Sequence, residues 1–455
     1  MPARLIESLG TTGPLADVFS DESVLQAMLD FEAALARAEA RAGILPRSAA
    51  EAIATAAHAP HFDVAALSRE SLRAGTPGIP LVQALTSRVR DTNPEAARFV
   101  HWGATSQDVA DTALILLLKR SRPILLADLS RLEIALGNLS ERHRNTVLLG
   151  RTLLQAAPPV TFGLKAAGWF AAIRRSRMRL ESAFGEALVV QFGGASGTLA
   201  ALGGEGLAVG QALAENLGLE FPDAPWHAHR DRLAALLAAC GVLTGCLGKL
   251  ARDISLLMQG EVGEAAEPSG QGRGGSSTMP QKHNPIASAL ALAAAQRVPG
   301  LVASFLSSMV QEHERGVGGW QAEWPIVASV IQAMGAAIVS MAEAAEGLDV
   351  NVVQMREDIE ATRGAVFAER VTMLLGAAMG RDVAHKIVEE AVRRSAAQRR
   401  KLGDVLAENS EVTALLGPQV LSNLESPEAY LGVAETLRQR LLAAPAPRGS
   451  KERKP

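Results

Sequence analysis

The sequence contains little of what β-sheets and disulfide bonds require. It has one tyrosine, two cysteines and 4% aromatic residues, and runs of alternating β-branched residues are few. Because aromatic and β-branched side chains dominate strands, these shortages argue against a β-rich fold. Cys240 and Cys246 are spaced so that a helix would place them on different faces, which argues against a local disulfide. This cysteine usage fits a reducing cytoplasm.

An excess of one charge sign is also missing. The chain has 45 Lys and Arg against 48 Asp and Glu, a formal net charge of -3, so no basic surface for nucleic acid is indicated. No basic segment followed by an apolar one opens the chain, and we expect a cytoplasmic protein without a secretion signal. The best membrane candidate, at 233–248, is rich in small residues and slightly short for a span, so we interpret it as a buried bundle helix.

Long helical periodicity is what the chain has in abundance. Ser20 is the predicted N-cap of a helix that ends at Gly43. Farther along, apolar residues recur at helical spacing in long runs, at 111–145, 161–187, 231–260, 284–314 and 325–347. Helices of about 30 residues are about 45 Å long and usually bury their apolar surfaces against each other and against partner subunits. We therefore predict an oligomeric helical bundle.

We expect an all-α fold divided into three parts. Residues 1–110 form an N-terminal helical domain, residues 111–347 a central domain of long bundled helices, and residues 348–455 a C-terminal helical domain that ends in a solvated tail. With 455 residues, 48% of them hydrophobic, the chain is long enough to bury a core in each part.

Polar islands interrupt the helical pattern. The first, "HWGATSQDVADT" at 101–112, places Thr105 and Ser106 directly before a long helix, so that hydroxyls and free N–H groups can bind an anion. Simple helix capping by Ser106 or Asp108 is the alternative. Another island, "QFGGASGT" at 191–198, is glycine-rich but lacks the Lys-Ser/Thr pair of a phosphate-binding loop, and we interpret it as a tight turn.

Two further islands contain paired or clustered prolines. "GRTLLQAAPPVTFG" at 150–163 carries Arg151, Thr152 and Gln155 ahead of a Pro-Pro step, and taken alone it is typical of an ordinary loop between helices. "GRGGSSTMPQKHNP" at 272–285 combines glycines and serines with prolines that fix the start of the next helix. A mobile segment beside a fixed helix start is typical of a lid over a site.

Cations near these islands suit an anionic substrate. Lys282 and Asn284, at the start of that helix, can bind a carboxylate. Arg315, in the stretch "EHERGVGGWQAEW", offers a planar fork that matches a carboxylate. The stretch "WHAHRD" places His227 and His229 at a spacing seen in metal sites, but no third ligand lies nearby in the sequence, and we predict no metal.

In chain order, "GATSQD", "GRTLLQAAPPVTFG", "GGASGT" and above all "GSSTMPQKHNP" resemble the motifs of the fumarase/aspartase superfamily, and with the helices the resemblance covers nearly the whole chain. It implies mostly helical domains in each subunit, a homotetramer joined through a central helical bundle, and active sites shared between subunits. Members carry out β-eliminations and additions on succinate-like substrates without a cofactor. "HWGATSQDVADT", "APWHAHRD" and "EHERGVGGWQAEW" most resemble a cycloisomerase branch, which closes a tricarboxylate diene to a γ-lactone in protocatechuate breakdown.

The resemblance implies roles position by position. Ser276, the first serine after Gly275, would be the acid or base on the loop, and Lys282 and Asn284 would hold and polarise a carboxylate. The other implied substrate-binding residues are His101, Thr105, Ser106, Arg151, Thr152, Gln155, His283 and Arg315. The implied partner is a small tricarboxylate, and neither nucleic acid nor a membrane is implied.

One departure from the superfamily pattern separates its branches. Many members carry Thr-His in the second island, where the His helps to protonate the leaving group, and this chain has Thr152-Leu153. A nitrogen leaving group requires that proton. For a lactone, the leaving group in the reverse direction is a carboxylate with a pKa near about 4, which departs without a proton. We expect Leu153 to form an apolar wall, which favours a cycloisomerase over an adenylosuccinate-type lyase that releases fumarate.

A catalytically silent structural relative, as in lens crystallin, is another alternative, and the presence of Ser276, Lys282 and Asn284 argues against it. The exact substrate stays open, because a substituted analogue of the diene would carry much of the same charge.

Overall fold

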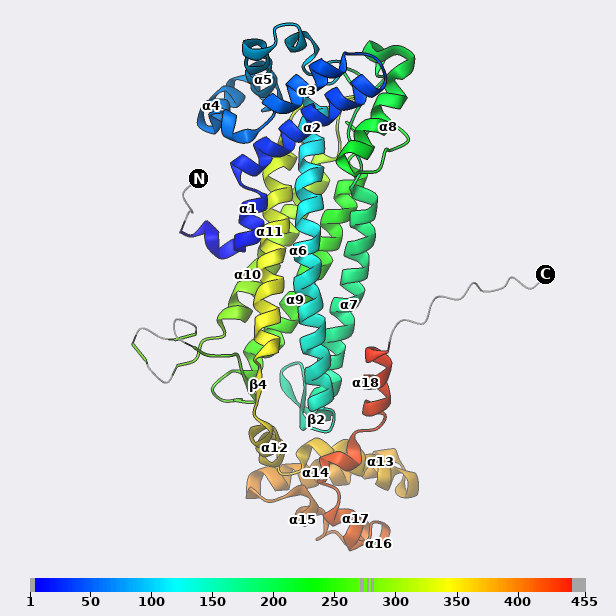
Figure 1. Cartoon of the computed structure of the whole chain (residues 1–455). Coiled ribbons are helices and arrows are strands. Elements are labelled where there is room, and N and C mark those ends of the chain that lie inside the picture. The colour runs from blue at the N-terminus through cyan, green and yellow to red at the C-terminus, as the bar shows by residue number, and fades with distance from the viewer. Residues whose placement is uncertain (1–4, 271–273, 276–277, 280–281, 444–455) are drawn as a thin grey trace, which may run out of the picture. The chain divides into compact units, whose positions relative to one another are not determined.

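The computed structural model describes residues 5–270, 274–275, 278–279 and 282–443, and Figure 1 shows its ribbon. Helices dominate, so the predicted all-α class is confirmed. Each of the long apolar runs is a helix: α6 (Ser106–Arg142), α7 (Phe162–Ala187), α9 (Asp231–Leu257), α10 (Ile286–Ser308) and α11 (Gly319–Glu346).

Shorter elements complete the fold. Ser20 caps α2 as predicted, because its hydroxyl accepts a hydrogen bond from the N–H of Ser23. The shorter helices are α1 (Gly13–Val18), α2 (Asp21–Arg41), α3 (Arg47–Ala56), α4 (Val64–Ala74), α5 (Gly78–Thr92), α8 (Gly206–Leu217), α12 (Val352–Ala361), α13 (Ala368–Met379), α14 (Arg381–Gln398), α15 (Leu402–Leu406), α16 (Ser410–Leu415), α17 (Pro418–Ser422) and α18 (Ala434–Leu442). The strands are β1 (Val147–Thr152), β2 (Gln155–Thr161), β3 (Ala265–Ala266) and β4 (Asp349–Val350).

The chain divides into two compact units that are discontinuous in sequence. Unit 1 comprises Met1–Ser130, Arg175–Gly248 and Leu290–Ser340, and unit 2 comprises Arg131–Arg174, Lys249–Ala289 and Met341–Pro455. The boundary falls inside each of the five long helices. The division into domains at 1–110, 111–347 and 348–455 stays a prediction.

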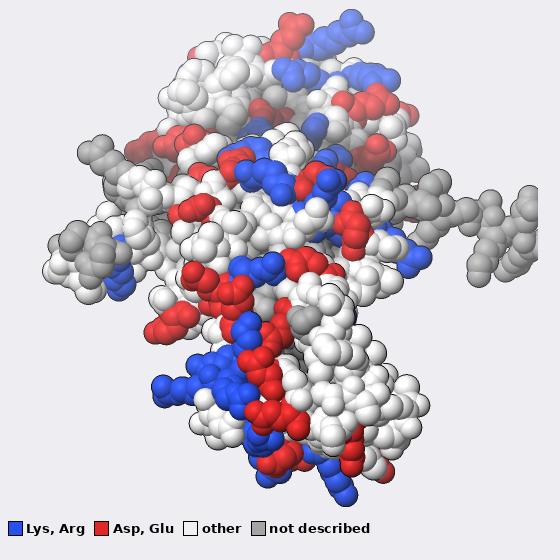
Figure 2. Space-filling view, turned by 90° about the horizontal axis from the view of Figure 1, so that it is seen from below, with Lys and Arg blue, Asp and Glu red and all other residues white. Residues whose placement is uncertain are grey.

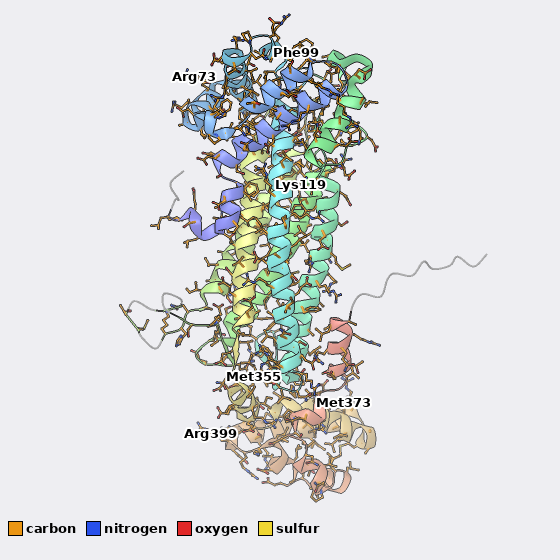
Figure 3. All side chains as sticks on the ribbon, in the orientation of Figure 1. Arg73, Phe99, Lys119, Met355, Met373 and Arg399 are labelled. Atoms are coloured by element: carbon orange, nitrogen blue, oxygen red, sulfur yellow. The ribbon has the colours of Figure 1, made fainter. Side chains whose placement is uncertain are left out.

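In unit 1 the long helices run side by side, with α2 to α5 and α8 gathered at the end where α6 begins (Figure 1). Lys119 of α6 fixes one of these elements (Figure 3): its ammonium donates to the carbonyl oxygens of Leu217 (2.8 Å) and Gly218 (2.7 Å) at the end of α8. A positive charge at a helix C-terminus is stabilising, because the terminal carbonyl groups carry partial negative charge.

In unit 2 the β1–β2 ribbon packs on the C-terminal helices through a small core of Val147, Leu149, Ile359, Val366 and Phe367. Basic and acidic side chains are interspersed on the face of the molecule that Figure 2 shows. Exposed ion pairs of this unit, such as Arg400 with Glu408, join the two signs. This surface agrees with the balanced composition.

By length and composition, three of the described helices are apolar enough to cross a membrane: α9, α10 and α11. In the most apolar windows of α9 and α11, 61% and 67% of the residues are buried within the chain, as expected of interior bundle helices. The corresponding window of α10 is only 28% buried. Its apolar surface is therefore available to another chain.

Candidate active site

One buried carboxylate ties the start of α6 to the glycine-rich island. Asp108, in the first turn of α6, is fully buried. It accepts hydrogen bonds from the backbone N–H groups of Thr105 (3.1 Å), Gly193 (3.0 Å) and Gly194 (2.9 Å). Its fourth partner is Nε2 of His227, at 2.6 Å. Asp108 therefore links α6 to distant parts of the chain, and its role goes beyond the simple helix capping that the sequence offered as the alternative.

The N-terminus of α6 keeps free hydrogen-bond donors. The N–H groups of Ser106 and Gln107 have no partner among the described residues, and neither does the hydroxyl of Ser106. Orphan N–H groups at a helix start carry the positive end of the helix dipole and attract anions. The part of the chain that suggested an anion site therefore retains the groups to bind one.

Arg315 reaches the same loop from the segment between α10 and α11. Its Nη1 donates to Oγ1 of Thr105 (2.9 Å), and its Nη2 donates to the carbonyl oxygens of Gly194 (3.3 Å) and Ala195 (3.0 Å). These acceptors are uncharged, and no carboxylate in the described part of the chain pairs with Arg315. A part-buried guanidinium without a counter-charge, beside a free helix N-terminus, is suited to a substrate carboxylate.

Glycine is required where Gly194 supplies that carbonyl oxygen. Its φ is +67°, and a Cβ built there would lie 2.7 Å from the carbonyl oxygen of Gly103. Both the backbone conformation and the close approach exclude a larger residue. The glycine-rich island is a tight turn, as predicted, and its polar backbone groups face the candidate site.

Arg230 has the opposite surroundings. It is fully buried, and its Nη1 and Nη2 donate to Asp111 at 2.7 and 3.0 Å. Its Nε and Nη2 donate to Glu323 at 3.0 and 2.6 Å, and its guanidinium lies 4.6 Å from the centre of the Trp226 ring. Burial acts to lower the pKa of Arg230, but the two carboxylates outweigh it and raise that pKa. This compensated cluster fixes α6, α11 and the start of α9 within unit 1.

The positive charge of His101 also has a carboxylate partner. Its Nδ1 lies 2.7 Å from Oε1 of Glu32. Burial acts to lower the pKa of His101, but the charge and hydrogen bond of Glu32, with a contribution from Asp108, raise it. The imidazole is therefore protonated over a wider pH range than usual, and Glu32 balances its charge.

The second island is a β-hairpin, and the interpretation as a loop between helices is wrong. β1 and β2 pair antiparallel, with Thr152 opposite Gln155. The tip residues Leu153 and Leu154 have φ values of +51° and +63° and are 97% and 75% exposed. Two residues with positive φ form the tight turn that suits the twist of a hairpin. In the single chain the side chain of Leu153 is therefore exposed to solvent, and it does not form the apolar wall that the sequence suggested.

Arg151, which precedes the hairpin tip, is compensated by carboxylates. Its guanidinium donates to Glu264 at 2.7 and 3.0 Å and to Asp358 at 3.2 Å. Glu264 is fully buried, so this ion pair joins β1 to the segment that follows α9. The charge of Arg151 is therefore balanced by carboxylates of the same compact unit, unit 2.

The signature loop is described only in part, and Ser276 lies outside the described residues. The N–H of Asn284 donates to the carbonyl oxygen of Gly274 at 2.8 Å, which closes the loop at its base. Lys282 and His283 are exposed, and their side chains have no partner among the residues that the structure describes. The ammonium of Lys282 and the ring nitrogens of His283 are therefore not used by any residue that the structure describes.

The helix after this loop has no free N-terminus. The carboxylate of Glu267 accepts from the N–H groups of Ala287 (2.9 Å) and Ser288 (2.8 Å) and from the Ser288 hydroxyl (2.6 Å). A carboxylate from this chain thus occupies the start of α10, and of these two helix starts only that of α6 is open to a substrate anion.

The structure brings the candidate residues together in separate groups. Unit 1 holds His101, Thr105, Ser106 and Arg315 around the start of α6. Unit 2 holds Arg151, Thr152 and Gln155 on the hairpin, and Lys282, His283 and Asn284 on the signature loop.

Sequence reasoning did not find the buried supports of the unit 1 group. These supports are Asp111, Gln191, Arg230 and Glu323. Each lies in or next to a polar island, and that clustering was the available signal.

Comparison with known proteins agrees with these features. Residues 7–300 match a lyase family, and residues 364–441 match the adenylosuccinate lyase C-terminus. The chain is 49% identical to a 3-carboxy-cis,cis-muconate cycloisomerase of Bradyrhizobium diazoefficiens, over 93% of this chain and 94% of that protein. It is 48% identical to the enzyme of that name from Pseudomonas aeruginosa, over 97% and 96%.

A solved structure has the same fold. The 3-carboxy-cis,cis-muconate lactonizing enzyme from Pseudomonas putida superposes with a TM-score of 0.91 at 44% identity, covering 97% of this chain and 98% of that chain. The chain therefore belongs to the lyase family that its motifs indicated, the fumarase/aspartase superfamily, and it is an enzyme of that fold.

Proposed function

We propose that the protein is a cytoplasmic cycloisomerase that converts 3-carboxy-cis,cis-muconate to 4-carboxymuconolactone. The observation that carries this proposal is the guanidinium of Arg315, which has no carboxylate partner among the described residues and lies beside Thr105 at the N-terminus of α6. A substrate with three carboxylates requires such cations, and the near full-length similarity to cycloisomerases supports this choice of anion. Lys282 and His283 supply further donors that have no partner among the described residues.

The reaction is an intramolecular addition. An oxygen of one substrate carboxylate forms a C–O bond to an alkene carbon, and the π electron pair moves to the neighbouring carbon. A carboxylate attached there holds the charge as an enolate-like dianion, which Lys282, Asn284 and helix N-termini stabilise. Arg315 holds another substrate carboxylate, equally in the ground state and the transition state. A proton, delivered by Ser276, then adds to that carbon. No atom leaves, so the lactone is an isomer of the substrate.

The acting form in this proposal is a homotetramer with active sites shared between subunits. The apolar window of α10, only 28% buried, supports an intersubunit bundle. The exposed leucines at the hairpin tip, Leu153 and Leu154, suit a contact with another chain. Sedimentation should give a tetramer, and a stable monomer at micromolar concentration would contradict this part of the proposal.

The direct test is to incubate the purified protein with 3-carboxymuconate and follow the diene absorbance. We expect loss of the diene, a product of unchanged mass in H₂O, and one added deuterium in D₂O. Parallel incubation with adenylosuccinate should release no fumarate. Efficient fumarate release with an unchanged diene would replace the cycloisomerase with an adenylosuccinate-type lyase. A strong chelator should leave the activity intact.

The role of Ser276 has its own test. Ser276→Ala should lower kcat by about 10²–10⁴-fold while the protein stays folded, because positioned acid-base groups contribute that much. Ser277→Ala is the matched control and should have the smaller effect. The reverse order would move the proton-transfer role to Ser277.

A further inference from the structure

Asp108 and His227 form a buried hydrogen-bonded pair next to the loop that presents Thr105. Their side chains are 0% and 3% exposed, and His227 Nε2 lies 2.6 Å from Asp108 Oδ1. A carboxylate taken out of water at this depth is stable only when its oxygens are well hydrogen-bonded. The hydrogen-bond partners of Asp108 therefore indicate what this buried pair does in the structure.

Both oxygens of Asp108 are fully used. Oδ1 accepts from His227 and from the N–H of Gly193, and Oδ2 accepts from the N–H groups of Thr105 and Gly194. His227 is the side-chain donor in this set, and the other donors are backbone groups from two separate loops. Asp108 thus sets the distance between the Thr105 loop and the glycine-rich turn.

The glycine-rich turn is shaped around the imidazole of His227. A Cβ on Gly193 would lie 2.7 Å from the ring Cε1, and a Cβ on Gly197 would lie 4.0 Å from Nδ1. The ring therefore occupies the space that a side chain at Gly193 would need. Nε2 has to carry a hydrogen to donate to the carboxylate, so this nitrogen is not available as a metal ligand.

The two loops that Asp108 joins are the ones that hold Arg315. Thr105 Oγ1 accepts from Arg315 Nη1, and the carbonyl oxygen of Gly194 accepts from Nη2. A shift of either loop would move the guanidinium, since these contacts and the one to Ala195 are its described hydrogen bonds.

We propose that Asp108 and His227 are positioning residues that place Thr105 and Arg315 for a substrate carboxylate. The inference rests on the proposed function, because it assumes that Arg315 binds the substrate. It predicts an effect of His227 on substrate binding although the imidazole is buried and does not reach the guanidinium itself. A purely structural role predicts a loss of stability without a selective effect on substrate binding.

The kinetic test compares variants of matched size. His227→Leu removes the donor, and His227→Gln keeps an N–H that can reach Asp108. We expect His227→Leu to raise KM for 3-carboxymuconate at least about tenfold, or about 1.4 kcal/mol, with kcat within about threefold of wild type. His227→Gln should restore KM to within about threefold. The exposed His229→Leu is the control and should leave both constants unchanged.

Hydrogen exchange tests the same inference without an enzymatic assay. In wild type the N–H groups of Thr105, Gly193 and Gly194 should be protected, and in His227→Leu their exchange should accelerate at least about tenfold. Exchange in α13 and α14 should stay unchanged. If wild type does not consume the diene, the proposed function fails and this measurement still decides whether the pair fixes the two loops.

Several results would overturn the positioning role. One is an unchanged KM together with unchanged exchange in His227→Leu. Another is a fall in kcat alone, and a third is failure of His227→Gln to restore KM. If His227→Leu does not fold, Asp108→Asn and the milder His227→Gln provide the same comparison, and exchange of both loops at wild-type rates in Asp108→Asn would equally contradict the inference.

Discussion

Arg230 and Arg315 lie in the same compact unit, and their surroundings differ in charge. Arg230 is fully buried between Asp111 and Glu323, whereas Arg315 donates only to uncharged oxygens among the described residues. A buried guanidinium that is fully paired holds elements together, and an unpaired one near a free helix N-terminus can attract an anion. The difference separates the structural arginine from the one suited to substrate binding.

The largest expected effect comes from breaking the paired cluster. Arg230→Met leaves two buried carboxylates without their cation, and removal of one partner of a buried ion pair costs about 3–5 kcal/mol. We expect a large fall in Tm or loss of the folded protein. Arg37, exposed and without a described partner, is the control, and Arg37→Met should stay within about 0.5 kcal/mol of wild type. Equal Tm values for the two variants would remove the structural role of Arg230.

A buried acid without a cation extends the comparison. Glu39 is fully buried, neither of its carboxylate oxygens has a described hydrogen-bond partner, and burial followed by the charge of Glu32 raises its pKa to about 9. The unfolded chain loses this proton near its ordinary pKa, and the folded chain keeps it to about pH 9. The folded state therefore binds more protons in this window, and stability falls as pH rises.

Glu39→Gln should remove that pH dependence. We expect little change of Tm at pH 5 and a stabilisation of about 1–3 kcal/mol near pH 9, because a neutral amide replaces a carboxylate that has to ionise unpaired. Exposed Glu51→Gln is the control. Equal effects of Glu39→Gln at both pH values would show that the wild-type carboxyl titrates normally.

The smallest expected effect is at the hairpin tip. Leu153→His adds an acid where the superfamily often has one. Ring closure has no leaving group, and in the reverse direction the carboxylate leaves without a proton, so the added acid has nothing to assist. The variant should cycloisomerise no faster than wild type, and wild type should not cleave adenylosuccinate. A rate increase of at least roughly tenfold, which is about 1.4 kcal/mol in the barrier, would refute the interpretation of Leu153.

The sequence predicted what depends on local pattern. The five long helices, the cap at Ser20 and the glycine-rich turn follow from periodicity, capping chemistry and glycine spacing. Motif order was enough to indicate the superfamily. Thr105 and Ser106 were placed correctly before a helix, because a helix start can be read from its own residues.

What the sequence did not predict depends on distant partners. The ribbon β1–β2 lacks strand composition in "AAPPV", and it forms through tertiary pairing. Glu267 caps α10 from 20 residues away, and Asp108 bonds His227 across 119 residues. No local signal shows that Arg151 and Arg230 are paired with carboxylates, or that Arg315 has no such partner in the described part of the chain. The choice among the candidate cations therefore required the structure.

The most direct test of the account is KM for 3-carboxymuconate in Arg315→Ala and Arg151→Ala, measured beside Tm. Arg315 has no described counter-charge, so its loss should raise KM at least about tenfold and leave Tm nearly unchanged. Arg151 is compensated by Glu264 and Asp358, so its loss should lower Tm and affect KM less. An unchanged KM in Arg315→Ala, with the increase found in Arg151→Ala, would contradict the assignment of Arg315 as the substrate-binding cation.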